Sequence, residues 1–365
     1  MARVSILMMP EPGHYLPTLR IAQTLRLRGN TVCYATLPYF EAFFRRQGFE
    51  IQTIAIPGLP ECDKGDIFST LTINRVVRKR LSEHLVDTKR SLREFLRQVI
   101  STTECDLLIC DSTFGESLGP IAGELSRHVV FMNVTLPTND GPSGYPNHHE
   151  LVLCPYALEM PATSAHMTNR LYGEPSIYRQ RLKRCFPWHE LEDSKPMVYC
   201  SFGSQAAGYP LAADTLQCVV KACAYLPAIQ FVLVVDSFHQ LKLSAIPKNV
   251  IVVESAPQPE LLDLAAAFIT HGGLGSVKEA IMAKVPMVII PFSVDQPSNA
   301  KRVEYHRLGY GCMPQDCSPQ RLADLVIDVT SNGEIGDSLR AMNELFTKTE
   351  DEAPALRFIE DLLLE

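Results

Sequence analysis

Short apolar runs alternate with helical segments through two separate stretches of this chain, and that alternation limits the possible fold more than any other feature. In the first stretch the segments between the apolar runs have helical spacing, and the runs themselves lie at 4–10, 31–37, 49–56, 105–110 and 128–136. Continuous apolar strands separated by helices are typical of a parallel sheet covered on both faces. The pattern predicts a doubly wound α/β domain in the N-terminal half.

A second stretch of alternation begins at residue 197. Its apolar runs lie at 197–204, 231–237, 250–255, 266–273 and 285–291. Between the two stretches, residues 137–150 are rich in Pro, Gly and Asn, which indicates a loop. Residues 150–185 have an irregular helical pattern, and 185–196 is interpreted as an interdomain linker.

We therefore predict two doubly wound α/β domains in tandem. The first covers 1–187, the second covers 188–348, and a terminal helix at 349–365 packs back on the first domain. In open sheets of this type the ligand lies at the carboxyl ends of the strands, so we expect the site in a cleft between the domains.

Composition and charge exclude several classes of function. The chain is 46% hydrophobic and 21% charged, which is typical of a folded soluble protein. A net charge of -7 argues against a nucleic-acid surface, and we interpret the basic runs at 75–80 and 179–184 as solvated helix faces. No run of 18 apolar residues occurs, and the first residues lack the apolar region of a signal peptide, so we expect a cytoplasmic protein without a membrane span.

The eleven cysteines include three pairs at C-x4-C spacing. In a chain without an export signal such cysteines are expected to be reduced. Further Cys or His ligands at zinc-binding spacing are missing around the pairs, which are Cys105 with Cys110, Cys218 with Cys223, and Cys312 with Cys317. We expect buried thiols and no metal site.

A glycine-rich turn follows the apolar run at 265–270. The next ten residues, 271–280, read HGGLGSVKEA and predict a strand that enters a turn and then a helix. Such a turn presents unpaired backbone N–H groups and the positive end of the helix, which attract phosphate. A dinucleotide fingerprint needs glycine where Lys278 stands, and no phosphate-loop motif occurs. From the turn alone, tight packing and anion binding both stay open.

The neighbours of this turn narrow the interpretation. APQPELL precedes it at 256–262, while VPMVIIP and DQPSNA follow at 285–291 and 295–300. In this order and spacing, the segment 256–300 resembles the nucleotide-sugar signature of the family 1 glycosyltransferases. The segment 12–30, PGHYLPTLRIAQTLRLRGN, extends the resemblance. It implies the GT-B fold of two facing Rossmann-like domains, and a microbial enzyme of the natural-product or macrolide type that uses a UDP- or dTDP-linked sugar.

The resemblance implies a set of residues for the diphosphate of the donor. His271, the backbone near Gly273 and the hydroxyl of Ser276 would hold the phosphates. The loop SFGS at 201–204, with Gly203 and Ser204, would close on them. N–H and hydroxyl donors suit phosphate oxygens.

The rest of the donor has its own implied residues. Gln258 would lie by the nucleoside, Glu279 would accept hydrogen bonds from the ribose, and Asp295 and Gln296 would hydrogen-bond the sugar hydroxyls. Ser255 stands where many relatives have a tryptophan that stacks on uracil, so uridine and thymidine donors both stay open.

A histidine near the N-terminus supplies the expected base. His14 lies in the loop after the first apolar run, and the resemblance implies that it takes a proton from the acceptor hydroxyl. Asp111, at the end of another strand, would fix its tautomer and stabilise the imidazolium; a helix N-cap is the alternative role for Asp111. We expect direct displacement with inversion. The helix end, His271 and Ser276 would help the nucleoside diphosphate to leave, so no metal or other cofactor is expected, and the absence of an Asp-x-Asp motif is consistent with this.

The acceptor is expected against the first domain. Residues 57–75 and 141–150 would surround it, and Phe68, Phe114 and Tyr145 would form an apolar pocket, although core packing explains these aromatic residues as well. We interpret His148 and His149 as polar loop residues. By analogy with the family, the acceptor would be a lipophilic small molecule such as a polyketide, macrolide or aromatic aglycone.

Other functions stay open on the same fold. These are N-acetylglucosaminyl transfer to a lipid, sugar epimerisation, and a catalytically silent helper protein that binds a nucleotide sugar. An NAD-dependent oxidoreductase is disfavoured because neither domain has the fingerprint. The sequence specifies neither the sugar nor the oligomeric state.

Overall fold

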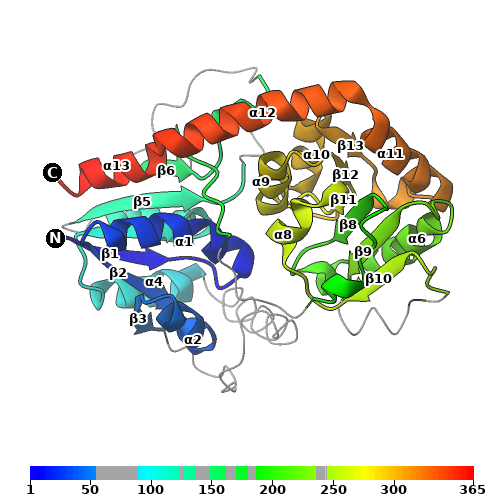
Figure 1. Ribbon diagram of the computed structural model, residues 1–365. Coiled ribbons are helices and arrows are strands. Elements are labelled where there is room, and N and C mark those ends of the chain that lie inside the picture. The colour runs from blue at the N-terminus through cyan, green and yellow to red at the C-terminus, as the bar shows by residue number, and fades with distance from the viewer. Residues whose placement is uncertain are drawn as a thin grey trace.

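The protein folds into two parallel α/β domains joined by a long C-terminal helix (Figure 1). The computed structural model describes residues 1–54, 89–123, 127–136, 148–161, 170–179, 186–235, 243 and 245–365. The predicted fold class of two doubly wound domains is confirmed.

The first domain is built on a seven-stranded sheet of order β3-β2-β1-β4-β5-β6-β7. All neighbouring strands are parallel, and they span Arg3–Leu7 (β1), Thr31–Thr36 (β2), Glu50–Thr53 (β3), Leu107–Asp111 (β4), His128–Asn133 (β5), His149–Val152 (β6) and Arg170–Tyr172 (β7). The helices are Pro12–Leu27 (α1), Pro38–Arg46 (α2), Lys89–Ser101 (α4) and Gly115–Ala122 (α5), with a 3-10 turn at Ser112–Phe114 (η1). The sheet order places β1 beside β4, so the loops that follow these two strands lie at the same edge.

The irregular helical pattern predicted for 150–185 is wrong in the described part of that segment. There, β6 and β7 extend the first sheet, and only a 3-10 turn lies between them, at Tyr156–Leu158 (η2). Glu150 and Arg170 are register partners on these strands and form an ion pair of 2.8 Å. Strands of three or four residues are too short to show an alternating pattern, and their pairing depends on contacts that sequence periodicity does not report.

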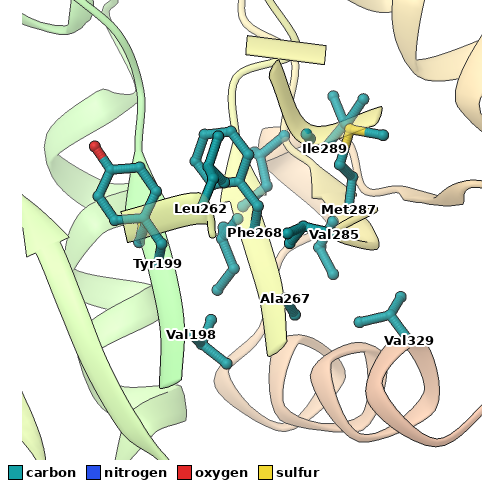
Figure 2. Close-up of a cluster of buried hydrophobic side chains, with 14 of the residues drawn as sticks. Val198, Tyr199, Leu262, Ala267, Phe268, Val285, Met287, Ile289 and Val329 are labelled. Atoms are coloured by element: carbon teal, nitrogen blue, oxygen red, sulfur yellow. The ribbon is translucent and has the colours of Figure 1, made fainter. Parts of the chain in front are cut away.

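The second domain has a six-stranded parallel sheet of order β10-β9-β8-β11-β12-β13. The strands span Met197–Ser201 (β8), Gln230–Val234 (β9), Val250–Val253 (β10), Ala265–Thr270 (β11), Met287–Ile289 (β12) and Gly309–Gly311 (β13). The helices are Ala212–Cys223 (α6), Gln258–Leu262 (α8), Leu274–Ala283 (α9), Gln296–Tyr305 (α10) and Pro319–Ser331 (α11), with 3-10 turns at Trp188–Glu190 (η3), Ala206–Gly208 (η4) and Pro314–Asp316 (η5). Figure 2 shows Tyr199 and Phe268 side by side in the core, where their rings stack with centroids 5.1 Å apart.

Two C-terminal helices connect the domains. Helix α12, at Gly333–Glu352, runs from the second domain toward the first, and α13, at Pro354–Leu362, lies along the first (Figure 1). Helix α12 buries Phe346 in the core of the second domain, whereas α13 buries Ile359 in the core of the first. The buried carboxylate of Glu174 accepts the backbone N–H groups of Ala355 and Leu356 and so caps α13.

The nine described cysteines are free thiols. Six are buried and three are partly buried, and of the C-x4-C pairs only Cys312 and Cys317 bring their sulfurs within 3.3 Å. No helix in the described ranges combines the length and the apolar character needed to cross a membrane.

Candidate active site

Loops from the two domains meet at the carboxyl ends of β1 and β8. Helices α8 and α9 lie on the side of the second domain that faces the first (Figure 1). Gln205, after β8, donates from Nε2 to the carboxylate of Glu11, after β1, at 3.3 Å. Buried Lys278 of α9 donates from Nζ to the carbonyl oxygen of Leu153 in the first domain at 2.6 Å. The two halves of the site are therefore in direct contact.

His14 and Asp111 form a hydrogen-bonded pair on the first domain. His14 lies in the first turn of α1, where Pro12 occupies the first helical position, and its Nδ1 is 2.6 Å from Oδ2 of Asp111. With Nδ1–H donating to the carboxylate, Nε2 carries the lone pair that can accept a proton. The strand order explains the pairing, because Asp111 ends β4 next to β1.

The carboxylate of Asp111 is buried and accepts several hydrogen bonds. Its Oδ2 also accepts the backbone N–H of Met9 at 3.1 Å, and its Oδ1 accepts the N–H and hydroxyl of Thr113 at 3.0 and 2.8 Å. Burial raises the pKa of Asp111, but the bonds from His14 and Thr113 outweigh burial and hold that pKa below its ordinary value. Asp111 thus caps η1 and orients His14 at the same time.

On the second domain, the imidazole of His271 lies between two glycines. Gly203 has φ +74, and a Cβ there would lie 2.6 Å from Cε1 of the ring. A Cβ on Gly273 would lie 2.6 Å from Nε2. Gly273 is also the N-cap of α9, so the open N–H groups of that helix begin beside the imidazole. Only glycine lets both backbones approach the ring this closely.

The stability of the fold should report the charge state of His271. Burial lowers the pKa of His271 from 6.5 to about 4, against a smaller opposing effect of the Ser201 backbone. Between these values the unfolded chain binds more protons than the folded one, so stability falls as pH falls from 6.5 toward 4. Over this pH range we expect the wild-type protein to lose about 3 kcal/mol in the free energy of unfolding because of His271, and His271→Asn to lack this loss. The difference between the urea-unfolding pH profiles of the two proteins measures it. Parallel profiles would contradict this.

The three residues expected around the nucleoside and its phosphates lie together. Gln258 donates from Nε2 to Glu279 Oε2 at 2.8 Å and to Ser276 Oγ at 3.3 Å. Its Oε1 accepts from the hydroxyl of Tyr199 at 3.4 Å. Helices α8 and α9 supply these groups from neighbouring positions, so amide, hydroxyl and carboxylate form one polar cluster at the start of α9.

Asp295 ends the turn between β12 and α10, Gln296 is the first residue of α10, and their side chains have different partners. Asp295 is buried, accepts from Asn299 Nδ2 at 2.9 Å, and has its pKa raised by burial. Gln296 instead directs its Oε1 to the backbone N–H of Phe292 at 2.8 Å and of Ser293 at 3.1 Å.

The tip of this turn is strained. Val294 has φ +57 and is 83% exposed, a conformation that is unfavourable for a β-branched residue. We expect Val294→Gly to raise the free energy of unfolding by about 1 kcal/mol, because glycine adopts this conformation without strain. Val294→Ala, which keeps a Cβ, should gain less. Urea denaturation measures both, and a less stable Val294→Gly protein would contradict the prediction.

Part of the expected acceptor region can be placed. Phe114 lies partly buried in η1 against the core of the first domain. The ring of His148 donates to the carbonyl of Gly119 at 3.3 Å. His149, expected in a loop, is instead the first residue of β6 and packs on Phe358 of α13. Phe68, Tyr145, the whole of 57–75 and most of 141–150 lie outside the described residues.

The structure adds residues that the sequence analysis missed. Asn299 donates to both Gly272 O and Asp295 Oδ2, and its spacing of four from Asp295 on a helix could have indicated the pair. Tyr209, which accepts from Gln296, carries no local signal. Within the described residues, no group of three or more His, Cys, Asp or Glu side chains is arranged to hold a metal ion.

The chain is similar in sequence to known glycosyltransferases. The family model for UDP-glucoronosyl and UDP-glucosyl transferase matches residues 190–323. The NDP-glycosyltransferase YjiC of Bacillus subtilis is 24% identical over 371 residues, which is 93% of this chain and 92% of YjiC. The uncharacterized UDP-glucosyltransferase YdhE of the same organism is 28% identical over 193 residues, or 53% of this chain, and the match spans about half of YdhE (48%).

Solved structures match the fold along the whole chain. The glycotransferase of kitacinnamycin has a TM-score of 0.75 at 21% identity and covers 99% of this chain and 98% of its own. The calicheamicin glycosyltransferase CalG4 has a TM-score of 0.73 at 18% identity, with coverage of 100% and 98%. The GT-B fold of the whole chain and the family match of its second domain together confirm the resemblance to the family 1 glycosyltransferases.

Proposed function

We propose that this protein transfers a sugar from a nucleoside diphosphate sugar to a hydroxyl group of a small, lipophilic acceptor, with inversion at the anomeric carbon. One observation carries the proposal: the hydrogen-bonded pair of His14 and Asp111 lies at the edge of the first sheet where Glu11 accepts a hydrogen bond from Gln205 of the second domain. The names of the relatives, an NDP-glycosyltransferase among them, support the same activity.

The start of α9 is proposed to bind the diphosphate. The N–H groups after Gly273, the hydroxyl of Ser276 and the loop of Gly203 and Ser204 offer hydrogen-bond donors beside the positive helix end. With a pKa of about 4, His271 is neutral at pH 7 and adds a donor without adding a charge.

Glu279 and Gln258 are proposed to hold the ribose and the nucleoside, and Asp295 the sugar hydroxyls. Carboxylates accept strong hydrogen bonds from hydroxyl groups. We expect Glu279→Ala to raise the KM for the donor about 10- to 100-fold with a smaller change in kcat, because the lost bonds involve a charged group. Initial rates over a range of donor concentrations measure this, and an unchanged donor KM would contradict it.

The chemistry would proceed as one displacement. Nε2 of His14 takes the proton from the acceptor hydroxyl while that oxygen forms a bond to the anomeric carbon. The bond from the anomeric carbon to the phosphate oxygen breaks, and the nucleoside diphosphate leaves with the electron pair. Asp111 stabilises the imidazolium, and the start of α9 stabilises the leaving group, so we propose a reaction that needs no metal ion.

A transfer assay tests the proposal. The purified chain is incubated in EDTA buffer with UDP-glucose or dTDP-glucose and a panel of aromatic and macrolide aglycones, and products are identified by mass spectrometry. The proposal expects a glycoside and an equal amount of nucleoside diphosphate. Donor binding without turnover would instead identify a catalytically silent helper.

We further propose that the protein acts in the cytoplasm.

A further inference from the structure

The turn Phe292–Gln296, which ends in the first residue of α10, contains one unfavourable backbone conformation. It presents Asp295 next to a tip residue, Val294, in the left-handed region with φ +57. Backbone in such a conformation persists when surrounding contacts determine it. The position of Asp295 therefore depends on the side-chain contacts that hold the turn in this conformation.

One set of contacts comes from the α10 side. Asn299 donates from Nδ2 to Asp295 Oδ2 and to the carbonyl of Gly272, each at 2.9 Å. Gln296, only 4% exposed, closes the turn by accepting the N–H groups of Phe292 and Ser293 at its Oε1. The amide of Gln296 is thus turned inward, toward the backbone of its own turn.

A second set of contacts comes from Tyr209, which follows η4 in the segment after β8. Its hydroxyl accepts from Gln296 Nε2 at 2.8 Å, and its ring stacks on Phe292 with centroids 4.9 Å apart and planes 7° apart. Phe202, in the loop of Gly203, packs edge-on against the same Phe292 at 5.1 Å. Tyr209 therefore contacts both ends of the turn from the segment that carries the phosphate-side loop.

We propose that Tyr209 is a positioning residue for sugar recognition. It fixes the amide of Gln296 and the ring of Phe292, and through them it sets where Asp295 meets the transferred sugar. The inference rests on the proposed function.

Discrimination between epimeric sugars depends on the position of the Asp295 carboxylate. Epimeric donors differ only in the direction of one hydroxyl group, so discrimination requires the accepting carboxylate to be held within about 0.5 Å of its place. A turn released from Tyr209 would keep the carboxylate but spread its positions. The loss should therefore appear in the choice between epimers and not in the binding of the sugar-free nucleotide.

The test compares Tyr209→Phe with the wild-type protein. Tyr209→Phe removes the hydroxyl and keeps the ring stack. The measured quantity is kcat/KM for the preferred donor divided by kcat/KM for its C4 epimer. The donor pairs are UDP-glucose with UDP-galactose and dTDP-glucose with dTDP-galactose. We expect this ratio to fall about five- to tenfold in Tyr209→Phe, as for one lost hydrogen bond. Affinity for UDP and dTDP, measured by calorimetry, should stay unchanged.

A matched control is Tyr310→Phe. This variant removes the hydroxyl of Tyr310 in β13, which accepts a hydrogen bond from Asn332. Its epimer ratio should equal that of the wild type. If the wild type transfers sugar and the epimer ratio of Tyr209→Phe is unchanged, the inference is overturned and the proposed function is not. Equal losses in Tyr209→Phe and Tyr310→Phe also overturn it, since they would report general loosening. A wild-type protein that transfers no sugar overturns the proposed function and this inference with it.

Discussion

Replacement of His14 by alanine is expected to reduce the rate of sugar transfer by about 10³-fold or more while leaving donor binding intact. The imidazole is the group placed to take the acceptor proton, and its buried partner Asp111 holds it at 2.6 Å. The groups proposed to bind the donor belong to the second domain, so affinity for UDP or dTDP should stay within about twofold of the wild type. Single-turnover transfer and calorimetric titration measure the two quantities.

Asp111→Asn tests whether the carboxylate of Asp111 fixes the tautomer of His14. An amide at this position can present its NH₂ to Nδ1 and so favour the wrong tautomer, and we expect a loss of transfer comparable to that of His14→Ala. His189→Ala, at an exposed histidine in η3, is the control and should retain wild-type turnover. Near-normal transfer by His14→Ala would refute the assignment of the base.

The largest expected effect on stability is at Arg302. Its guanidinium is 4% exposed and donates from Nε and Nη2 to Oε2 of Glu159 at 2.9 and 2.8 Å. Replacement by methionine leaves the mostly buried carboxylate of Glu159, 11% exposed, without this partner, and we expect a loss of about 3–5 kcal/mol in the free energy of unfolding. Because Arg302 is on α10 and Glu159 follows η2, the loss should also loosen the contact between α10 and the η2 segment. Urea denaturation followed by circular dichroism measures it.

Two controls separate this pair from charge effects in general. The double variant Arg302→Met with Glu159→Met removes both charges and should recover much of the stability. Arg307→Met breaks a pair with Glu334 at 3.5 Å in which both side chains are more than 70% exposed, and should change stability by less than about 0.5 kcal/mol. A loss below about 1 kcal/mol in Arg302→Met would contradict the assigned role.

The sequence predicts the strands that lie within the apolar runs, including the short β3, β10 and β12, and fails at β6 and β7. The runs that became β1, β4, β8 and β11 are five or six residues long and buried along most of their length. By contrast, β6 and β7 have four and three residues, and their place is fixed by pairing with β5 and by the Glu150–Arg170 ion pair. That information is spread over the tertiary structure and leaves no periodic signal.

Some contacts of the candidate site could also be predicted from the sequence, and others could not. The cluster of Gln258, Ser276 and Glu279 follows from motifs within about 25 residues of one another, and the pairing of His14 with Asp111 follows from two strand ends that share an edge. The inward turn of Gln296 could not be foreseen, because an amide serves a sugar hydroxyl and a backbone N–H equally well. Contacts such as Tyr209 to Gln296 and Gln205 to Glu11 depend on how loops from distant segments meet.

The stereochemistry of a single turnover tests the central claim most directly. The purified chain is given UDP-α-glucose or dTDP-α-glucose with an accepted aglycone in EDTA buffer, and the anomeric proton coupling of the product is read by NMR. The proposed mechanism predicts a β-glycoside formed in equal amount with the released nucleoside diphosphate, and no product from His14→Ala. An α-glycoside, or an equally active His14→Ala protein, would contradict it.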